Sequence, residues 1–327
     1  MTTSAPTIAV HLQPGDIARD LRADVLRGLT STPKELPPRW LYDARGCELF
    51  DAITELPEYY PTRTERAILT ASARAIADLS QADTLVELGS GTSEKTRLLL
   101  DALRDAGTLQ RFVGFDVAEG VLRDAADAIL AEYPGIEVAA VVGDFHRHLA
   151  HIPGGGRRMI AFLGGTIGNF DPAQRRRFLF DVDAMLDPGD SFLLGTDLVK
   201  DPGRLVAAYD DAAGVTAEFD RNALRVLNRE LGADFRPDAF DHVAHWDADE
   251  SWIEMRLVAR SPQVVHVPGL HDLVLELDAG QWLRTEISAK FTPEGIREEL
   301  WQAGLVVQEQ WTDADGDFLL SLATPYC

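Results

Sequence analysis

Cysteine is scarce in this chain: its 327 residues include only Cys47 and Cys327, and no pair has the spacing of a metal-binding motif. The eight histidines contain no His-Glu-x-x-His segment, a common signature of zinc hydrolases. We therefore expect no disulfide framework and no bound metal. Few cysteines are typical of a reducing compartment, so the expected location is the cytoplasm.

Basic residues and long apolar runs are also in short supply. The chain has 31 lysines and arginines against 53 aspartates and glutamates, which gives a formal charge of −22. Such a surface repels nucleic-acid phosphates and anionic lipids, which argues against both as partners. No apolar run approaches the length of a membrane span, and the first residues lack the basic-then-apolar pattern of a secretory signal. The sequence predicts a soluble globular protein, long enough for two domains.

A third glycine is missing from the segment around which the chain is organised. Residues 84–88 are an apolar run typical of a buried parallel strand; Gly89-Ser-Gly91 follows, and a helical pattern begins at Thr96. A dinucleotide fingerprint requires glycine where this chain has Glu94, which disfavours a nicotinamide-dependent dehydrogenase. Glu87, before the first glycine, can pair with the ammonium group of an amino acid. This arrangement is typical of S-adenosyl-L-methionine (SAM) methyltransferases, although a plain tight turn stays an alternative.

Acidic residues also follow the next two expected strands. Asp116 ends the second strand, where a carboxylate can accept hydrogen bonds from both ribose hydroxyls of an adenosine. Alternatively, Asp116 caps the helix that begins near Ala118. Asp144 and Phe145 follow the third strand, so that the carboxylate can bind the adenine amino group while the ring packs on the base.

Strand and helix alternate from residue 84 to residue 199, and an antiparallel hairpin at 305–323 ends the chain. This order predicts an α/β fold, a Rossmann-like seven-stranded class I SAM methyltransferase domain with an inserted α+β substrate-binding domain. Residues 1–10 show no strong periodic pattern and are expected to be disordered. The expected domains are residues 63–199 plus 290–327 for SAM binding and residues 11–62 plus 200–289 for substrate binding.

Two adjacent tyrosines lie between prolines in the segment Leu56-Pro-Glu-Tyr-Tyr-Pro-Thr-Arg-Thr-Glu65. If this segment is extended, successive side chains point to opposite faces, so Tyr59 and Tyr60 cannot both face a core. One hydroxyl is then free to line a pocket. Ordinary loop packing is an equal alternative from these residues alone.

Several segments together resemble the family of ergothioneine-pathway histidine Nα-methyltransferases. The resemblance extends from about residue 16 to the C-terminus, and Leu56–Glu65 is its most specific part. It implies three successive SAM-dependent methylations of the α-amine of L-histidine to the betaine hercynine, the first step of ergothioneine biosynthesis. The other segments are Thr32–Asp51, Val86–Thr96, Gly143–Phe145, Gly164–Asn169, Gly195–Asp211 and Thr285–Phe291.

The resemblance also implies which residues form the site. The expected SAM contacts, from the glycine segment and the resemblance together, are Glu87, Gly89, Gly91, Lys95, Asp116, Asp144 and Phe145. The histidine contacts that the resemblance implies are Tyr42, Tyr59, Asn169, Tyr209, Met255, Glu286 and Ser288. We expect a monomer whose partners are SAM, L-histidine and the mono- and dimethylated intermediates.

The chemistry of methyl transfer gives these residues roles. The attacking α-amine must be neutral, so Asn169, a neutral donor and acceptor, and Tyr59, a hydroxyl, are the expected catalytic residues. Glu286 can accept a hydrogen bond from an imidazole N–H, with Ser288 as its hydroxyl partner. A loop-turn role for Asn169 and an exposed strand position for Glu286 are the structural alternatives. A methyltransferase for another amino acid and a non-catalytic SAM or amino-acid sensor are the alternative functions.

Overall fold

The computed structural model describes residues 5–13, 15–145 and 147–326, and the chain divides into two compact units. The sheet unit comprises Met1–Gln13, Arg63–Leu198 and Phe291–Cys327, and the insert unit comprises Pro14–Thr62 and Val199–Lys290. Residues 11–13, expected in the substrate-binding domain, group with the sheet unit, where the His11 N–H donates to the Val142 carbonyl at 3.0 Å. The expected disorder of residues 1–4 and the tail cysteine Cys327 lie outside the described residues.

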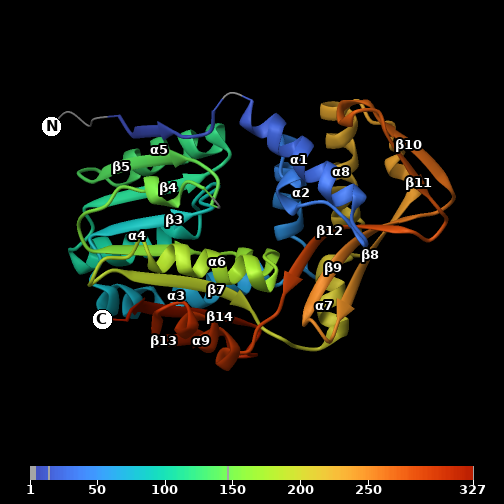
Figure 1. Ribbon diagram of the computed structural model, residues 1–327. Coiled ribbons are helices and arrows are strands. Elements are labelled where there is room, and N and C mark those ends of the chain that lie inside the picture. The colour runs from blue at the N-terminus through green and yellow to red at the C-terminus, as the bar shows by residue number, and fades with distance from the viewer. Residues whose placement is uncertain (1–4, 14, 146, 327) are drawn as a thin grey trace. The chain divides into compact units, whose positions relative to one another are not determined.

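The sheet unit is built on one eight-stranded sheet in the order β1-β5-β4-β3-β6-β7-β14-β13 (Figure 1). The strands from β1 to β7 are parallel, and β14 and β13 are antiparallel. Without β1, the sheet has seven strands, is mostly parallel and ends in the antiparallel hairpin, as expected, so the predicted α/β fold is confirmed. The strands are β1 Thr7–Val10, β3 Thr84–Leu88, β4 Arg111–Asp116, β5 Glu137–Val142, β6 Arg158–Phe162, β7 Ser191–Asp197, β13 Leu305–Thr312 and β14 Phe318–Pro325.

The eighth strand corrects the prediction for the N-terminus. Residues 7–10 were expected to be disordered, but Thr7–Val10 pair in parallel with Ala139–Val142 of β5. Four residues are too short for a periodic pattern to identify a strand. This strand forms because its backbone hydrogen bonds cover the edge of β5, a contact between segments far apart in sequence.

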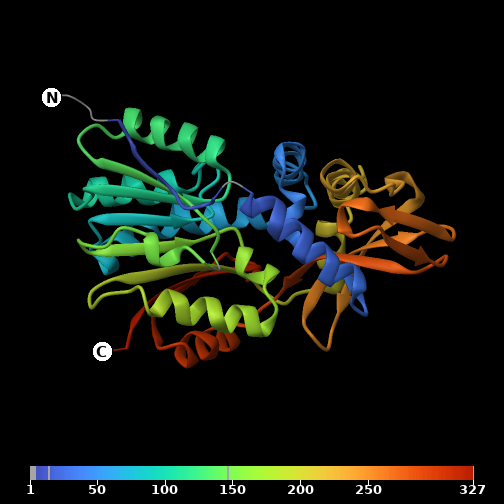
Figure 2. The ribbon, with the colours of Figure 1, turned by 45° about the horizontal axis from the view of Figure 1, so that its top comes forward.

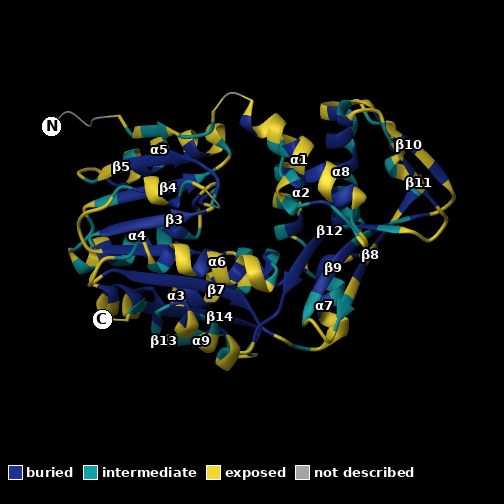
Figure 3. Cartoon of the chain, in the orientation of Figure 1, coloured by how far each residue is buried: buried dark blue, intermediate teal, exposed yellow. Residues whose placement is uncertain are grey.

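Helices cover both faces of the large sheet. Residues of α3, α4 and α5 share one core with inward side chains such as Met159 and Ala161 of β6. Phe162 points to the opposite face and contacts Phe178 of α6, with 4.7 Å between ring centroids. Strands β3 and β7 are therefore covered on both faces and buried along their length (Figure 3). The helices are α3 Pro61–Ser80, α4 Thr96–Ala106, α5 Glu119–Glu132, α6 Pro172–Asp183 and α9 Pro293–Gln302, with 3₁₀ turns η2 Leu149–His151 and η3 Thr166–Asn169.

Helices α6 and α9 lie beside each other (Figure 2) and are joined by side chains. The Arg175 guanidinium donates to both carboxylate oxygens of Glu299 at 2.9 and 3.0 Å. The dipeptide Asp171-Pro172 predicts a helix start, and in the structure Asp171 caps α6 while Gln174 completes a reciprocal capping box. This cap fixes the chain direction directly after η3, which ends on the expected site residue Asn169.

The insert unit contains a four-stranded sheet in the order β2-β12-β9-β8 and a separate β10-β11 hairpin. The sequence predicts a hairpin around residues 247–250, and the antiparallel pair of β8 and β9 confirms it; β12 also pairs antiparallel with β9. The strands are β2 Lys34–Glu35, β8 Phe240–Asp247, β9 Trp252–Ala259, β10 Gln263–Val267, β11 Leu273–Leu277 and β12 Trp282–Ala289. The helices are α1 Asp16–Thr30, α2 Ala44–Thr54, α7 Pro202–Tyr209 and α8 Val215–Leu231, with 3₁₀ turns η1 Pro38–Leu41, η4 Pro237–Ala239 and η5 Pro268–Leu270.

The sequence pattern predicts helices over residues 202–213 and 221–230, and both differ in the structure of the insert unit. Helix α7 ends at Tyr209 rather than near residue 213, and α8 begins at Val215 rather than 221. Asp211 explains the second difference, because its carboxylate accepts from the backbone N–H groups of Val215 at 3.0 Å and Thr216 at 2.7 Å. No helix among the described residues is long and apolar enough to cross a membrane.

Candidate active site

The glycine turn after β3 is held by the end of β4. The Gly89 N–H donates to the Phe115 carbonyl at 2.8 Å, and the Gly91 N–H donates to Asp116 Oδ2 at 3.0 Å. Both glycines have positive φ angles, +70° and +47°, which side chains rarely allow. The turn therefore needs glycine at both positions and opens at the carboxyl edge of a parallel sheet, where ligands bind in folds of this class.

Glu87 lies on β3, only 5% exposed, just before this turn. The Thr96 hydroxyl donates to its Oε1, while Oε2 is buried and has no hydrogen-bond partner within the described residues. Burial raises the pKa of Glu87 to about 7. A buried oxygen without a donor is costly unless a ligand supplies one. The binding of the SAM ammonium group by Glu87 stays a prediction.

Asp116 receives two backbone hydrogen bonds. Its Oδ2 accepts from Gly91, and its Oδ1 accepts from the Ala118 N–H at 2.9 Å, just before α5 begins. The capping alternative is thus part of what this residue does. Each carboxylate oxygen has a second lone pair, so the carboxylate can also accept ribose hydroxyls. The ribose role stays a prediction.

Phe145 lies close to the glycine turn. Its ring is 5.5 Å from that of Phe115 and 5.5 Å from that of Phe162, and a Cβ built on Gly89 would lie 3.4 Å from its Cζ. Asp144 is buried, and the Arg147 guanidinium lies 3.4 Å from its Oδ2. The structure thus places Gly89, Asp116 and Phe145 around the carboxyl ends of β3, β4 and β5.

Lys95 has a partner that the sequence analysis missed. Its ammonium forms an ion pair with Glu65 of α3, a fully buried carboxylate that also accepts from the Gly164 N–H at 2.8 and 3.0 Å. A Cβ on Gly195 would lie 2.2 Å from Glu65 Oε1, so the carboxylate requires glycine there. Glu65 thus ties Lys95 to the start of the turn that leads to Asn169. The sequence contains one indication of Glu65: it is the last residue of Leu56–Glu65, the most specific segment of the resemblance.

The expected aromatic residues of the insert unit lie in one cluster. Phe50 lies between two of them, 5.5 Å from Tyr42 and 6.2 Å from Tyr59 between ring centroids. Tyr59 in turn lies 6.1 Å from Tyr209 of α7, in an edge-on arrangement. Packing among η1, α2, the Leu56–Glu65 segment and α7 thus brings three tyrosines from distant parts of the chain together.

The two adjacent tyrosines are both buried. The prediction that Tyr59 and Tyr60 cannot both face a core is therefore wrong. Tyr59 is 8% exposed and Tyr60 is 1% exposed. Tyr60 has its own surroundings: the Lys200 ammonium donates to its hydroxyl at 2.7 Å, and the Arg204 guanidinium lies over its ring. Side chains from α7 and the residues before it cover Tyr60, which allows both rings to be buried in different places.

Glu286 lies on β12, directly opposite Met255 of β9. It is 7% exposed, so the alternative of an exposed strand position is wrong. Its Oε2 has no hydrogen-bond partner within the described residues. Burial, with a further contribution from Asp220, raises its pKa to about 8. Burial and, secondly, the negative charge of Glu286 raise the pKa of Tyr42 well above its ordinary value.

A buried polar network lies beside Glu286, and the sequence analysis missed it. Asp220 accepts from the Thr285 hydroxyl, and its Oδ2 lies 2.8 Å from His242 Nδ1. His242 Nε2 lies 2.7 Å from the Tyr209 carbonyl oxygen. Both ring nitrogens therefore face acceptors, which favours the imidazolium; burial opposes this, but the pKa of His242 is raised overall through Asp220. The network fixes Tyr209 and the residue before Glu286.

Ser288 does not have the surroundings expected for it. Its hydroxyl lies 2.8 Å from the Tyr209 hydroxyl and 2.8 Å from the ammonium of Lys290, a buried residue absent from the predicted site. Of the seven residues predicted to bind the substrate histidine, the structure places six in the insert unit. The seventh, Asn169, is half-buried at the end of η3 and belongs to the sheet unit, as do the predicted SAM residues.

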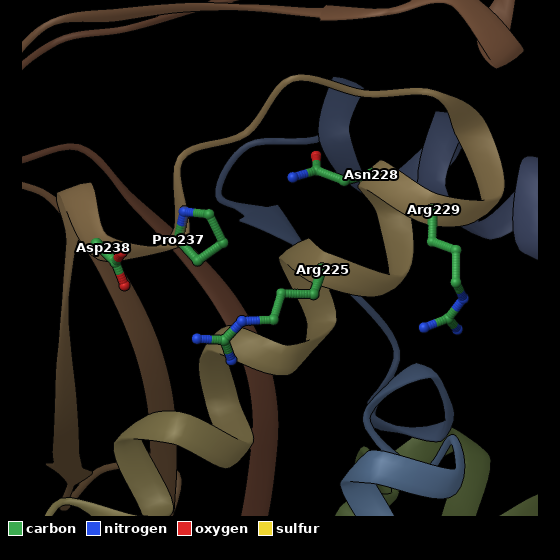
Figure 4. A pocket seen from close by; sticks show the side chains of 5 residues that line it. All are labelled: Arg225, Asn228, Arg229, Pro237 and Asp238. Atoms are coloured by element: carbon green, nitrogen blue, oxygen red, sulfur yellow. The ribbon is translucent and has the colours of Figure 1, made fainter.

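Two other features of the surface carry no site. A hollow of about 540 Å³ is lined by Arg225, Asn228, Arg229, Pro237 and Asp238 of α8 and η4 (Figure 4). Its arginines already form ion pairs, Arg225 with Glu218 and Arg229 with Asp43. Three aspartates of the β13–β14 turn, Asp313, Asp315 and Asp317, also converge, but the Asp313 carboxylate accepts backbone N–H groups of the turn itself.

Comparison with known proteins gives consistent matches over nearly the whole chain. Residues 21–325 match the model of a family described as "Histidine-specific methyltransferase, SAM-dependent". The histidine N-alpha-methyltransferase of Mycolicibacterium smegmatis is 60% identical, over 97% of this chain and 98% of the relative. That of Mycobacterium tuberculosis is 57% identical, with the same coverage. Ergothioneine biosynthesis protein 1 of Neurospora crassa is 31% identical over 86% of this chain and 32% of its own length.

Proposed function

Because this chain belongs to the family of SAM-dependent, histidine-specific methyltransferases, we propose that it transfers three methyl groups in succession from SAM to the α-amino nitrogen of L-histidine, giving hercynine. This is the first step of ergothioneine biosynthesis, in keeping with the similarity to the Neurospora crassa protein. Within the structure, the observation that carries the proposal is Glu286, a buried carboxylate with one oxygen that has no partner among the described residues and with an electrostatic influence on Tyr42 of the tyrosine cluster.

The sheet unit is the proposed SAM-binding domain. SAM supplies a methyl group on a positively charged sulfur, and its amino-acid end carries the ammonium that Glu87 is placed to accept. Asp116 would bind the ribose, Asp144 and Phe145 the adenine, and the backbone of Gly89 and Gly91 would allow close approach. Lys95 would act on this site through Glu65, since these two side chains are paired.

The insert unit is the proposed histidine-binding domain. Glu286 would accept the imidazole N–H, and Ser288 with Tyr209 would bind the remaining ring nitrogen. Met255, opposite Glu286 on β9, would limit the size of the ring. Tyr42 would line the same pocket, since its phenol lies near Glu286. A site built on such hydrogen bonds rejects rings that cannot make them.

Methyl transfer requires alignment and a neutral amine. The displacement is in line, so the residues around the amine mainly fix its position and exclude water. Tyr59 and Asn169 are the proposed catalytic residues, because a hydroxyl and an amide can bind the amine without demanding its positive charge. The mono- and dimethylated amines, the proposed intermediates, would be bound in the same way.

The partners proposed for this enzyme are small molecules only. Its charge of −22 argues against nucleic acid and anionic membranes, and we propose that it acts as a monomer in the cytoplasm. The dehydrogenase alternative is wrong, because the family transfers methyl groups from SAM. A preference for another amino acid and a sensor role are the outcomes against which the experiment must discriminate.

The experiment that tests the proposal uses the purified protein, SAM labelled in its methyl group and a panel of amino acids. We expect label to appear in histidine, with mono-, di- and trimethylated products resolved by mass spectrometry. Label in tryptophan or phenylalanine but not histidine would favour the other-substrate alternative. Binding of SAM and histidine without transfer to either would favour a sensor.

A further inference from the structure

Lys290 continues the binding face of β12 by one position. Glu286, Ser288 and Lys290 are spaced two residues apart, and side chains at this spacing share one face of an extended chain. The Lys290 N–H donates to the Ser251 carbonyl at 2.8 Å, which holds the chain extended beyond Ala289, the end of the strand. The side chain is buried, with the residue only 3% exposed. A lysine is rarely buried to this extent without a role for its ammonium group.

The ammonium group of Lys290 binds two residues of the proposed histidine site. Its Nζ lies 2.8 Å from the Tyr209 hydroxyl, 2.8 Å from the Ser288 hydroxyl and 4.5 Å from the centre of the Tyr209 ring. The two hydroxyls lie 2.8 Å apart. An ammonium can only donate, so both hydroxyl oxygens accept from Lys290. When the Tyr209 hydroxyl donates to Ser288, the Ser288 hydroxyl keeps its own proton for donation to a ligand.

We propose that Lys290 is a positioning residue for ring recognition, which fixes the Ser288–Tyr209 pair as a hydrogen-bond donor toward the bare nitrogen of a neutral imidazole while Glu286 accepts from its N–H. This inference rests on the proposed function and adds a residue to it. The site then requires a ring with one donor and one acceptor nitrogen. Phenylalanine has neither, and an imidazolium has two donors and no acceptor.

The charge of Lys290 also acts on Glu286. Two charged groups bear on that carboxylate besides burial: Asp220, which raises its pKa, and Lys290, which lowers it. Without the ammonium, Glu286 would lose its proton only at a higher pH. Because the proposed role of Glu286 requires the ionised carboxylate, histidine binding would then need more alkaline conditions. A side chain that only fills space would not produce this shift.

The test replaces Lys290 by methionine, which keeps the length and removes the charge. Histidine affinity is measured by calorimetry across neutral and alkaline pH, and kcat/KM is measured for histidine and phenylalanine. We expect the preference for histidine to fall about tenfold or more, mainly through KM, and the pH of half-maximal histidine binding to rise. SAM affinity should not change. An equal loss at every pH with an unchanged preference would overturn the inference.

A second variant and a control keep the test decisive. Lys290→Arg keeps the charge but moves the donors, so it should keep the pH dependence and lose the preference for histidine; an unchanged preference in this variant would overturn the inference even if Lys290→Met does not fold. Lys34→Met, the same change at a lysine that donates to the Leu29 carbonyl, is the matched control. Failure of the wild-type enzyme to methylate histidine would instead refute the proposed function.

Discussion

Among the residues that the structure describes, each unit contains one buried glutamate with a carboxylate oxygen that has no hydrogen-bond partner, and the two glutamates differ in how they are surrounded. Glu87 receives the hydroxyl of Thr96, nine residues further along the chain, and burial raises its pKa to about 7. Glu286 interacts electrostatically with Tyr42 and Asp220, which come from distant segments; burial and Asp220 raise its pKa to about 8. One carboxylate is held by its own strand, turn and helix, whereas the other is held by packing.

This difference separates general from specific recognition. The proposed SAM site consists of a backbone turn and carboxylates at neighbouring strand ends, an arrangement that a parallel sheet supplies by its geometry. The proposed histidine site consists of side chains whose hydrogen bonds and charges must match one ring. We therefore expect substitutions at the proposed ring contacts of the insert unit to change which substrate is used and at which pH, and substitutions at the proposed SAM contacts of the sheet unit to change SAM affinity.

The largest effect should follow Glu286→Ala. Losing a hydrogen bond to a charged group costs roughly 1.5–3 kcal/mol, so histidine kcat/KM should fall by about tenfold or more. The enlarged pocket should let phenylalanine and tryptophan gain relative to histidine. Steady-state kinetics with the three amino acids measures this, and Glu276→Ala, at an exposed position on β11, is the matched control. An unchanged ratio among the three would mean that Glu286 does not bind the ring.

A slightly smaller effect should follow Asp116→Ala, and it should appear in the other substrate. Removing a carboxylate that accepts the ribose hydroxyls should weaken SAM binding by about 1–3 kcal/mol, while histidine binding to the insert unit is not directly changed. Calorimetry with each ligand measures both, with Asp124→Ala on the exposed side of α5 as the control. If Asp116 only supports the glycine turn and the start of α5, thermal stability will fall while SAM affinity stays the same.

The sequence predicted the sheet unit better than the insert unit for a physical reason. The order of β3, β4 and β5 and the acidic residues near their ends follow from local patterns, because parallel strands align their carboxyl ends. Glu65 was missed because its partners, Lys95 and Gly164, meet it only through folding. The strand at Thr7–Val10 was missed for the same reason, since its stability comes from pairing with β5.

In the insert unit, the residues of the predicted site came from the resemblance to a family rather than from any local pattern. No periodicity in the sequence indicates that Tyr42, Tyr59 and Tyr209 meet, because their cluster depends on how η1, α2 and α7 pack. The sequence does not predict the hydrogen-bonded pairs Asp220–His242 and Ser288–Lys290, for a related reason. A buried polar residue looks like an exposed one until its partners are known.

The pH dependence of histidine binding should give an effect of about tenfold. The pKa of Glu286 is raised to about 8, so below that pH the carboxylate is mostly protonated and must lose its proton to accept an N–H. Affinity should therefore rise about tenfold, or about 1.4 kcal/mol, between about pH 7 and about pH 9. Glu286→Gln has no carboxylate to titrate at this position, but the substrate histidine titrates equally with both proteins. The difference between the pH profiles of wild type and variant therefore reports the titration of Glu286 alone. Parallel pH profiles would show that Glu286 binds in its neutral form.

The smallest effects should come from two matched helix caps, one in each unit. Asp171 caps α6 directly after Asn169, and Asp201 caps α7, which ends on Tyr209. Replacing either by alanine removes a side-chain acceptor for backbone N–H groups, which costs about 1 kcal/mol of stability. Both variants should therefore unfold at lower temperature by similar amounts, as calorimetry can measure.

The two variants should differ in ligand binding. Only Asp201→Ala loosens the helix that positions the Tyr209 hydroxyl beside Ser288. In that variant histidine affinity should fall slightly, while SAM affinity stays the same. The comparison uses histidine affinity measured without SAM. If Asp171→Ala lowers this affinity as much as Asp201→Ala does, the insert unit does not bind the imidazole ring by itself.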